Sequence, residues 1–383
     1  MSYRALVARR CGRVPGRPRT KGFRVPVKEL SENAALMELA PSRGTGARQV
    51  VAWARSRDRW DAWCLLVATL VVLGVFALIE PTWFTGDTFQ LLVAQYTPLA
   101  LISVAMTFSI IAGHIDLSPG SMLGFTGIVV GLVFTWTGNI WLALLGGLGV
   151  ALCVALLHSA LVAGLGINSV VVTLGAYVWA RGLCDAANNG APIGVGGGIA
   201  NVVNAKWAGF TLTAPVVVAA FVGGAFLLRR TRFGRYSYAM GGGQTFARQA
   251  GINVTAYTAK IFLFMGVMIA AASFITVGQI SAADPSAGTN YELDAIIAVV
   301  IGGTSLTGGT GSMGRTALGM VFVAILDGGL ANLGLGEASY DLYSGVAFVC
   351  VLALQVLIRR SVVDRERVRD RVVGEQPLEA SLA

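Results

Sequence analysis

Long apolar runs, separated by short polar segments, dominate the chain from about residue 63 to residue 358. A membrane-spanning helix needs about 20 mostly apolar residues, whereas the strands of a membrane barrel would give shorter, alternating runs. The pattern therefore predicts an all-α polytopic membrane protein with about ten transmembrane helices. The expected spans are about Trp63–Ile79, Phe89–Ala112, Met122–Trp136, Ile140–Leu165, Asn168–Leu183, Leu212–Leu228, Ala259–Gln279, Leu293–Ile301 (extending to Leu306), Thr316–Leu335 and Tyr340–Ile358.

Composition and charge agree with this pattern. Of the 383 residues, 55% are hydrophobic and 13% charged, where a soluble domain carries about 25% charged residues. The net charge of +9 comes mostly from basic residues before Trp60, between Arg229 and Lys260, and after Ile358. Basic clusters of this kind mark cytoplasmic segments. With an even number of spans, all three clusters fall on one side, and both termini are expected in the cytoplasm.

The same features divide the chain into regions. We expect a basic, largely disordered tail at 1–60, a membrane domain at 61–360 with a cytoplasmic segment at 229–258, and a second cytoplasmic tail at 361–383. The arginines of the first tail could instead bind nucleic acid or anionic lipid. We favour a positive tail that orients the first span, and expect no nucleic-acid partner.

The stretch from Asn290 to Gly314 combines features that a lipid-exposed helix avoids. Glu292 and Asp294 open an apolar run, which ends in glycines mixed with Thr304 and Ser305. Acids at membrane depth are costly, and broken backbone is tolerated there only against protein or a water-filled cavity. We interpret the stretch as lining a passage. The alternative is a tight helix–helix contact, which small residues also permit.

A second polar motif, GHIDLSPGS, separates the second and third spans. Its Asp116 lies between apolar residues, and Pro119 with Gly120 interrupts a helix. Ser118 and Ser121 are expected to cap the helix that starts near Met122. We interpret the motif as a broken helix that lines a polar path. An ordinary turn between two spans is the alternative.

The two broken segments also suggest an internal symmetry. The break at Ser118–Ser121 and the break at Gly302–Ser312 are separated by five crossings, which gives the two halves opposite orientations. Opposite orientations of this kind are the pattern of inverted repeats.

The cytoplasmic segment from Arg232 to Val254 is punctuated by glycines. Residues from Gln244 to Ala250 are expected to form a short exposed helix, which Gly251 ends before Asn253 caps the next one. Such a helix can dock a soluble partner, and the residues expected to couple to it are Gly241, Gly242, Gln244, Arg248, Gly251 and Asn253. A solvated loop is the alternative.

Catalytic chemistry is not indicated by any motif. The chain has no GxSxG, HExxH or GxxxxGK[ST] sequence, so ATP binding would require another subunit. Its five cysteines show no CxxC pair, and no zinc or other metal site is expected. His114 and His158 are left without a role, since a lone histidine is more often structural.

Four motifs resemble those of the ribose/xylose-type permeases of bacterial ATP-binding-cassette importers, over about Phe84 to Ile358. They are GHIDLSPGS, RFGRYSYAMGG, RQAGINV and YELDAIIAVVIGGTSLTGGTGSMG. The resemblance implies a permease in the bacterial cytoplasmic (inner) membrane that imports a simple sugar, not an enzyme. It also implies a second permease copy or a paralogous permease, ATPase subunits that hold ATP and Mg²⁺, and an extracytoplasmic solute-binding protein.

Two departures from the family pattern affect these expectations. His114 replaces a usual glycine, and Gln244-Thr245-Phe246 replaces a segment that usually ends in glutamate, which removes a charge from the docking surface. An ion-coupled secondary transporter, with Asp116, Glu292 or Asp327 as the coupling acid, is the alternative function. The residues expected to line the translocation pathway are Asp116, Ser118, Ser121, Glu292, Asp294, Thr304 and Ser305.

Overall fold

The computed structural model describes residues 47–80, 85–207, 210–334, 339 and 342–357. The chain divides into two units, Met1–Arg55 and Ser56–Ala383, and the second contains the membrane helices. Most of the predicted N-terminal tail and all of the predicted tail at 361–383 lie outside the described residues. The first helix, α2, starts at Ala47, and its apolar, membrane-spanning part starts at Ala62.

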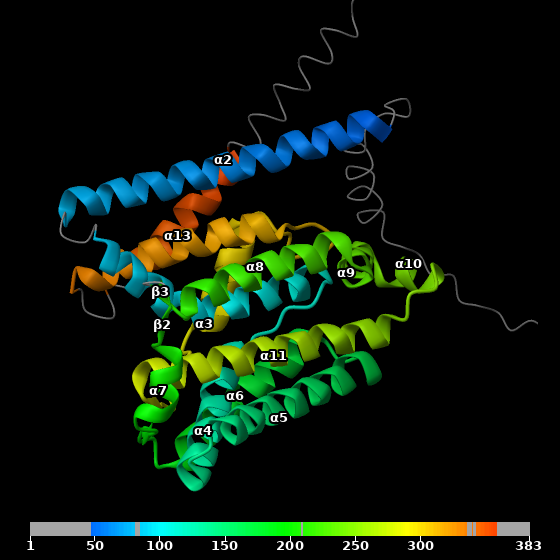
Figure 1. Ribbon diagram of the computed structural model, residues 1–383. Helices are drawn as coiled ribbons and strands as arrows, with labels where there is room; N and C mark the ends of the chain where they lie inside the picture. Colours follow the sequence, from blue (N-terminus) through cyan, green and yellow to red (C-terminus); the bar gives the residue numbers. More distant parts are fainter. Residues whose placement is uncertain (1–46, 81–84, 208–209, 335–338, 340–341, 358–383) are drawn as a thin grey trace, which may run out of the picture. The chain divides into compact units, whose positions relative to one another are not determined.

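Eight helices in the described part of the chain are long and apolar enough to cross a membrane (Figure 1). They correspond to the first seven predicted spans and the ninth. The helices are α2 (Ala47–Ile79), α3 (Gly86–Ile111), α4 (Pro119–Thr137), α5 (Ile140–Ser159), α6 (Ser169–Ala187), α8 (Thr213–Arg230), α11 (Val254–Ile280) and α13 (Met313–Asn332).

Side-chain caps fix several of these helix starts. Thr85, Asn139 and Asn168 each accept a hydrogen bond from a backbone N–H in the first turn of α3, α5 and α6. A cap of this kind satisfies one of the N–H groups that a helix start leaves unpaired. At its other end α5 continues into a single π-helical turn, η2 (Ala160–Gly164).

Short elements fill the connections. Between α6 and α8 lie β1 (Ile193–Gly194), α7 (Gly197–Val203), β2 (Lys206–Trp207) and β3 (Phe210–Thr211), and β2 pairs with β3. β1 pairs antiparallel with β4 (Ala282–Ala283), which follows α11. Helices α9 (Arg232–Gly242) and α10 (Gln244–Gln249) connect α8 to α11.

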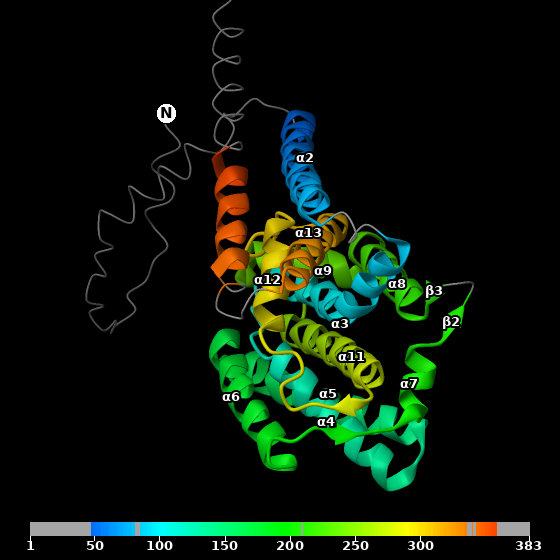
Figure 2. The ribbon, with the colours of Figure 1, turned by 90° about the vertical axis from the view of Figure 1, so that its left-hand side faces the viewer.

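The eighth predicted span is too short to cross a membrane as a single helix. Helix α12 contains only the 11 residues Tyr291–Ile301, about 16 Å of helix against a hydrocarbon core of about 30 Å. It starts after Asn290, which has a left-handed backbone, and ends at Gly302-Gly303, where Gly303 has a φ of +79°. Figure 2 shows α12 as a short helix beside α3 and α13. Of the tenth predicted span, Leu342–Leu357 is described as a shorter apolar helix.

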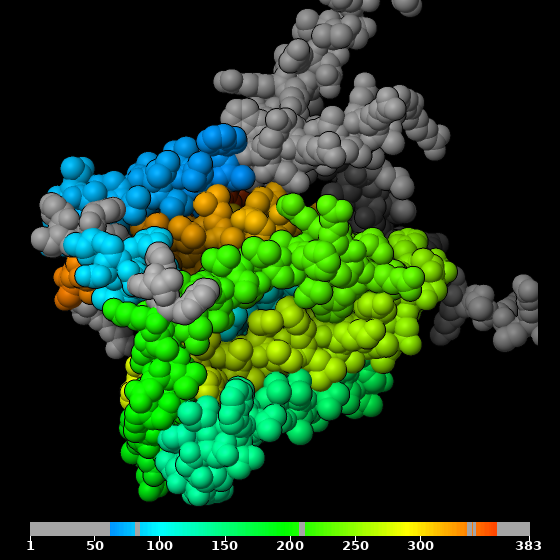
Figure 3. Space-filling view, in the orientation of Figure 1, coloured from blue at the N-terminus to red at the C-terminus, as the bar shows by residue number. Residues whose placement is uncertain are grey.

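Helix α3 lies at the centre of this unit. It contacts α11, α8, α12 and α13, and 67% of the residues in its most apolar stretch are buried. On the face drawn in Figure 3, α8 and α11 cover most of it. By contrast, α6 and α8 are 22% and 17% buried and expose many apolar side chains, which is the pattern expected of helices that face lipid or a partner.

Two glycines of α13 provide a test of the α12–α13 packing. A Cβ on Gly319 would collide with the Ala298 carbonyl of α12, whereas one on Gly314 meets no atom. We expect Gly319→Ala to destabilise the protein by about 1–3 kcal/mol through overpacking. Gly314→Ala should stabilise it slightly through helix propensity. Thermal unfolding in detergent compares the two, and equal melting temperatures would contradict this packing.

Candidate functional site

The turn between α3 and α4 is built around one buried carboxylate. Asp116 is 1% exposed, and its Oδ1 accepts hydrogen bonds from the Ser118 N–H (2.9 Å) and the Ser118 hydroxyl (2.6 Å). The Leu117 N–H donates to Thr173 of α6. Ser118 does occupy the N-cap position of α4, but its side chain makes no capping bond, and Ser121 lies inside the helix. The predicted capping role of Ser118 was wrong because its hydroxyl donates to Asp116 instead.

The turn before α12 repeats this arrangement. Oδ1 of Asp284 accepts hydrogen bonds from the Ser286 N–H and hydroxyl, both at 2.8 Å. The sequences correspond as well, because Asp-Leu-Ser-Pro-Gly-Ser at 116–121 matches Asp-Pro-Ser-Ala-Gly-Thr at 284–289. This likeness is visible in the sequence, but the predicted symmetry did not use it.

The two turns meet through glycine. A Cβ on Gly120 would collide with the Gly288 carbonyl oxygen, and a Cβ on Gly288 would lie 2.6 Å from the Gly120 carbonyl oxygen. The contact is thus reciprocal, as at a local two-fold axis. It relates the turn between α3 and α4 to the turn between α11 and α12, which is a different pairing from the one used for the predicted inverted repeat. The turn at 284–289, and not the glycines at 302–312, is the counterpart of Ser118–Ser121.

Four of the predicted pathway residues gather at this meeting point. Asp116, Ser118, Ser121 and Glu292 are all buried, at 4% exposure or less. The Glu292 carboxylate lies against Gly120 in the first turn of α4, while Glu292 itself belongs to the first turn of α12. Helix N-termini carry partial positive charge, so one carboxylate stabilises two helix starts at once.

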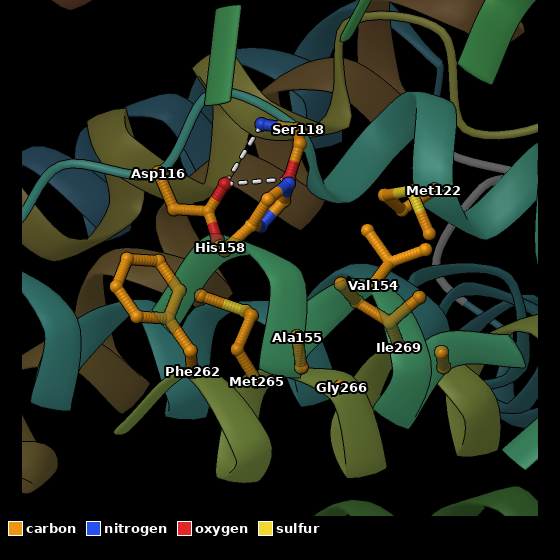
Figure 4. Close-up of a pocket in the computed structure, with 11 residues that line it drawn as sticks. Asp116, Ser118, Met122, Val154, Ala155, His158, Phe262, Met265, Gly266 and Ile269 are labelled. Atoms are coloured by element: carbon orange, nitrogen blue, oxygen red, sulfur yellow. Dashed lines mark hydrogen bonds between the residues drawn. The ribbon is translucent and has the colours of Figure 1, made fainter. Parts of the chain in front are cut away.

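These four residues form what we call the polar centre, and a small cavity adjoins it (Figure 4). Asp116 and Ser118 line it on one side, and His158 of α5 points into it. His158 is 4% exposed, and its Nε2 has no hydrogen-bond partner among the described residues. Apolar side chains of α4, α5 and α11 form the remaining wall, including Met122, Val154, Phe262, Met265 and Ile269. The cavity therefore has one polar side and one apolar side.

The other predicted pathway residues lie elsewhere. Asp294 is half-buried in the first turn of α12. Thr304 and Ser305 follow the far end of α12, which lies about 14 Å along the helix from Glu292. Thr304 is buried, and the Ser305 hydroxyl bonds to Thr307. The predicted pathway residues therefore fall into separate groups, one where the two turns meet and one beyond the C-terminal end of α12.

The glycine loop after α12 packs against the predicted cytoplasmic segment. The Gly309 N–H donates to the Ile111 carbonyl at the end of α3, and the Tyr238 hydroxyl of α9 donates to the Gly311 carbonyl. Gly241 lies so close to Gly308 and Gly309 that a Cβ there would collide with backbone. The glycines therefore form a tight contact, as the alternative interpretation held, and this contact ties α12 to α9.

The predicted docking helix is present as α10. Gly251 follows it with a φ of +81°, and Asn253 caps α11 by accepting a hydrogen bond from the Ala256 N–H. Gln244 and Arg248 are exposed, and Gly242 is exposed at the end of α9. The side chain of Phe246, 74% exposed, projects from α10. An exposed aromatic residue on a charged helix suits a protein contact.

Comparisons with known proteins identify the family. Residues 89–362 match the family described as the permease component of the branched-chain amino acid transport system. The ribose import permease protein RbsC of Escherichia coli (strain K12) is 34% identical over 299 residues, 76% of this chain and 92% of RbsC. The chain belongs to the sugar-importer permeases within this family.

Other sugar-importer permeases are similar over comparable lengths. RbsC of Bacillus subtilis (strain 168) is 31% identical, covering 74% of this chain and 89% of its own. The xylose transport system permease protein XylH of Haemophilus influenzae is 29% identical, covering 71% and 90%. As a sugar-importer permease, the chain is a transport subunit and not an enzyme. The family match contains both turns, the glycine loop and α10.

The two matching turns allow a controlled test of the buried site. Asp116→Ala leaves the Ser118 N–H unpaired in the interior, which should destabilise the protein by about 1–3 kcal/mol. Asp284→Ala removes the same two bonds from the exposed Ser286, where water replaces them, and should cost less than about 1 kcal/mol. Equal losses of unfolding free energy in the two variants would contradict the burial assigned to Asp116.

Proposed function

We propose that this chain is the membrane-spanning subunit of an importer that moves a monosaccharide into the cell by alternating access. The observation that carries the proposal is the meeting of two helix N-termini, with buried polar side chains, at the junction of an inverted repeat. Transport sites are commonly built in this way. The names of the relatives refer to ribose, xylose and L-arabinose, which supports a pentose-like substrate.

The substrate pathway in this proposal passes the polar centre and continues along α12. Asp116, Ser118, Ser121 and Glu292 contact the sugar first, and Asp294, Thr304 and Ser305 contact it nearer the cytoplasm. Each contact is a weak and replaceable hydrogen bond, because a carrier must also release its substrate. No covalent step occurs in this chain.

Partners supply the energy and the substrate. A cytoplasmic ATPase subunit holds ATP and Mg²⁺ and docks on α10 and its flanking residues, from Gly241 to Asn253. An extracytoplasmic binding protein delivers the sugar, and a second copy of the chain or a paralogous permease completes the pore. The protein lies in the bacterial cytoplasmic membrane with both termini in the cytoplasm, as the basic clusters indicate.

Reconstitution in liposomes tests this function. We expect uptake of radiolabelled D-ribose, D-xylose or L-arabinose only when the ATPase subunit, its ATP and the binding protein are all present. The permease alone, under a proton or Na⁺ gradient, should show none. Uptake driven by the ion gradient without the ATPase would instead establish the secondary-transporter alternative.

The docking role of α10 has its own test. Phe246→Ala and Arg248→Ala remove an exposed aromatic ring and an exposed charge, so they should not affect folding. Each should reduce substrate-stimulated ATPase activity of the complex at least about tenfold, as expected of central interface residues. Thr255→Ala, which changes an exposed residue of α11, is the control. Full stimulation in both variants would remove α10 from the interface.

A further inference from the structure

Glu292 presents a buried acceptor at the junction of the two repeats. The residue is 4% exposed, and the backbone N–H groups of Gly120 and of Glu292 itself stabilise its carboxylate. Its Oε2 nevertheless has no hydrogen-bond partner of ordinary geometry among the described residues. This atom lies against Gly120, at the start of α4. A buried carboxylate oxygen is rarely left unpaired, because desolvation without a hydrogen bond is costly. Its position and burial therefore point to a ligand.

Arg181 of α6 presents a buried donor at the same junction. Its Nη1 donates to the carbonyls of Pro285 (2.5 Å) and Ala287 (3.4 Å), which fixes the guanidinium against the turn before α12. Its Nη2 is buried and has no hydrogen-bond partner in the described part of the chain. Its Nη1 also lies 3.4 Å from the Cβ position of Gly124, four residues along α4 from Gly120.

The two charges lie beside the same end of α4. Glu292 lies against Gly120, and Arg181 lies beside Gly124 and against the turn before α12. An acid and a base are therefore about one helical turn apart along α4. Their free atoms, Oε2 and Nη2, offer one acceptor and one donor.

We propose that Glu292 and Arg181 form a binding site for hydroxyl groups of the transported sugar. A carboxylate accepts a hydrogen bond from a hydroxyl, and a guanidinium donates one to a hydroxyl oxygen. A single hydroxyl group can use both atoms, because it donates to the carboxylate and accepts from the guanidinium. The sequence patterns assigned no role to Arg181. This inference rests on the sugar-import function proposed above.

Deoxy analogues of the substrate provide the test. In liposomes with the ATPase subunit and binding protein, uptake of the pentose that the wild-type complex carries is compared with uptake of each of its monodeoxy analogues. The ratio of the two rates is measured for the wild type, Glu292→Gln and Arg181→Lys. Every sample contains the same binding protein, so its own preference cancels when variants are compared.

The expected result is a loss of discrimination. For at least one analogue, Glu292→Gln should lower the ratio of pentose uptake to analogue uptake about tenfold or more, toward one. The effect is large because the lost hydrogen bond involves a charged group. Arg181→Lys should do the same for at least one analogue. Asp87→Asn removes an exposed acid from the first turn of α3 and should leave every ratio unchanged. It controls for the loss of a carboxylate at a helix start.

A uniform effect would overturn the site. If both variants change uptake of the pentose and of all analogues by one common factor, or leave uptake unchanged, the two charges only support the fold. If Glu292→Gln lowers the melting temperature of the complex too far for transport, Arg181→Lys decides alone. A wild-type complex that carries no pentose would instead count against the proposed function itself, and the site would fall with it.

Discussion

The backbone contact between Gly120 and Gly288 is the constraint on which the centre of this protein depends. Neither position has room for a Cβ, because each glycine faces the carbonyl oxygen of the other. The Asp116–Ser118 and Asp284–Ser286 hydrogen bonds shape the two turns that bring these glycines together. Two helix starts thus converge inside an apolar bundle, and Glu292 offsets their partial positive charges.

This junction is connected to the predicted cytoplasmic segment by a short route. Helix α12 starts at the junction and ends at the glycine loop, which packs on α9 through Gly241 and Tyr238. Helix α9 leads directly into α10, the proposed docking helix. In the proposed transport cycle, a movement imposed on α10 by an ATPase would therefore reach the polar centre through α9, the loop and one helix of 11 residues. Tight backbone packing suits such a route, because close-packed contacts transmit displacement.

Much of this architecture follows from local features of the sequence. The long apolar runs predict the spanning helices, and Gly251 with Asn253 predicts the end of α10 and the start of α11. The depth of Asp116 also follows from its apolar neighbours. The short length of α12 does not follow from the sequence, because its apolar run resembles that of a full span. The helix is limited by the left-handed backbone of Asn290 and Gly303, which the sequence does not reveal. Arg181 and His158 join the centre through tertiary packing, which a single sequence does not encode locally.

The most direct test of this account is a double-mutant cycle on Gly120→Ala and Gly288→Ala, with unfolding free energies measured in mixed micelles. If the two glycines face each other, each substitution disrupts the same contact, and the double mutant should differ from the sum of the single mutants by about 0.5–3 kcal/mol. Additive losses, within about 0.3–0.5 kcal/mol, would show that the two turns do not meet and would contradict the account.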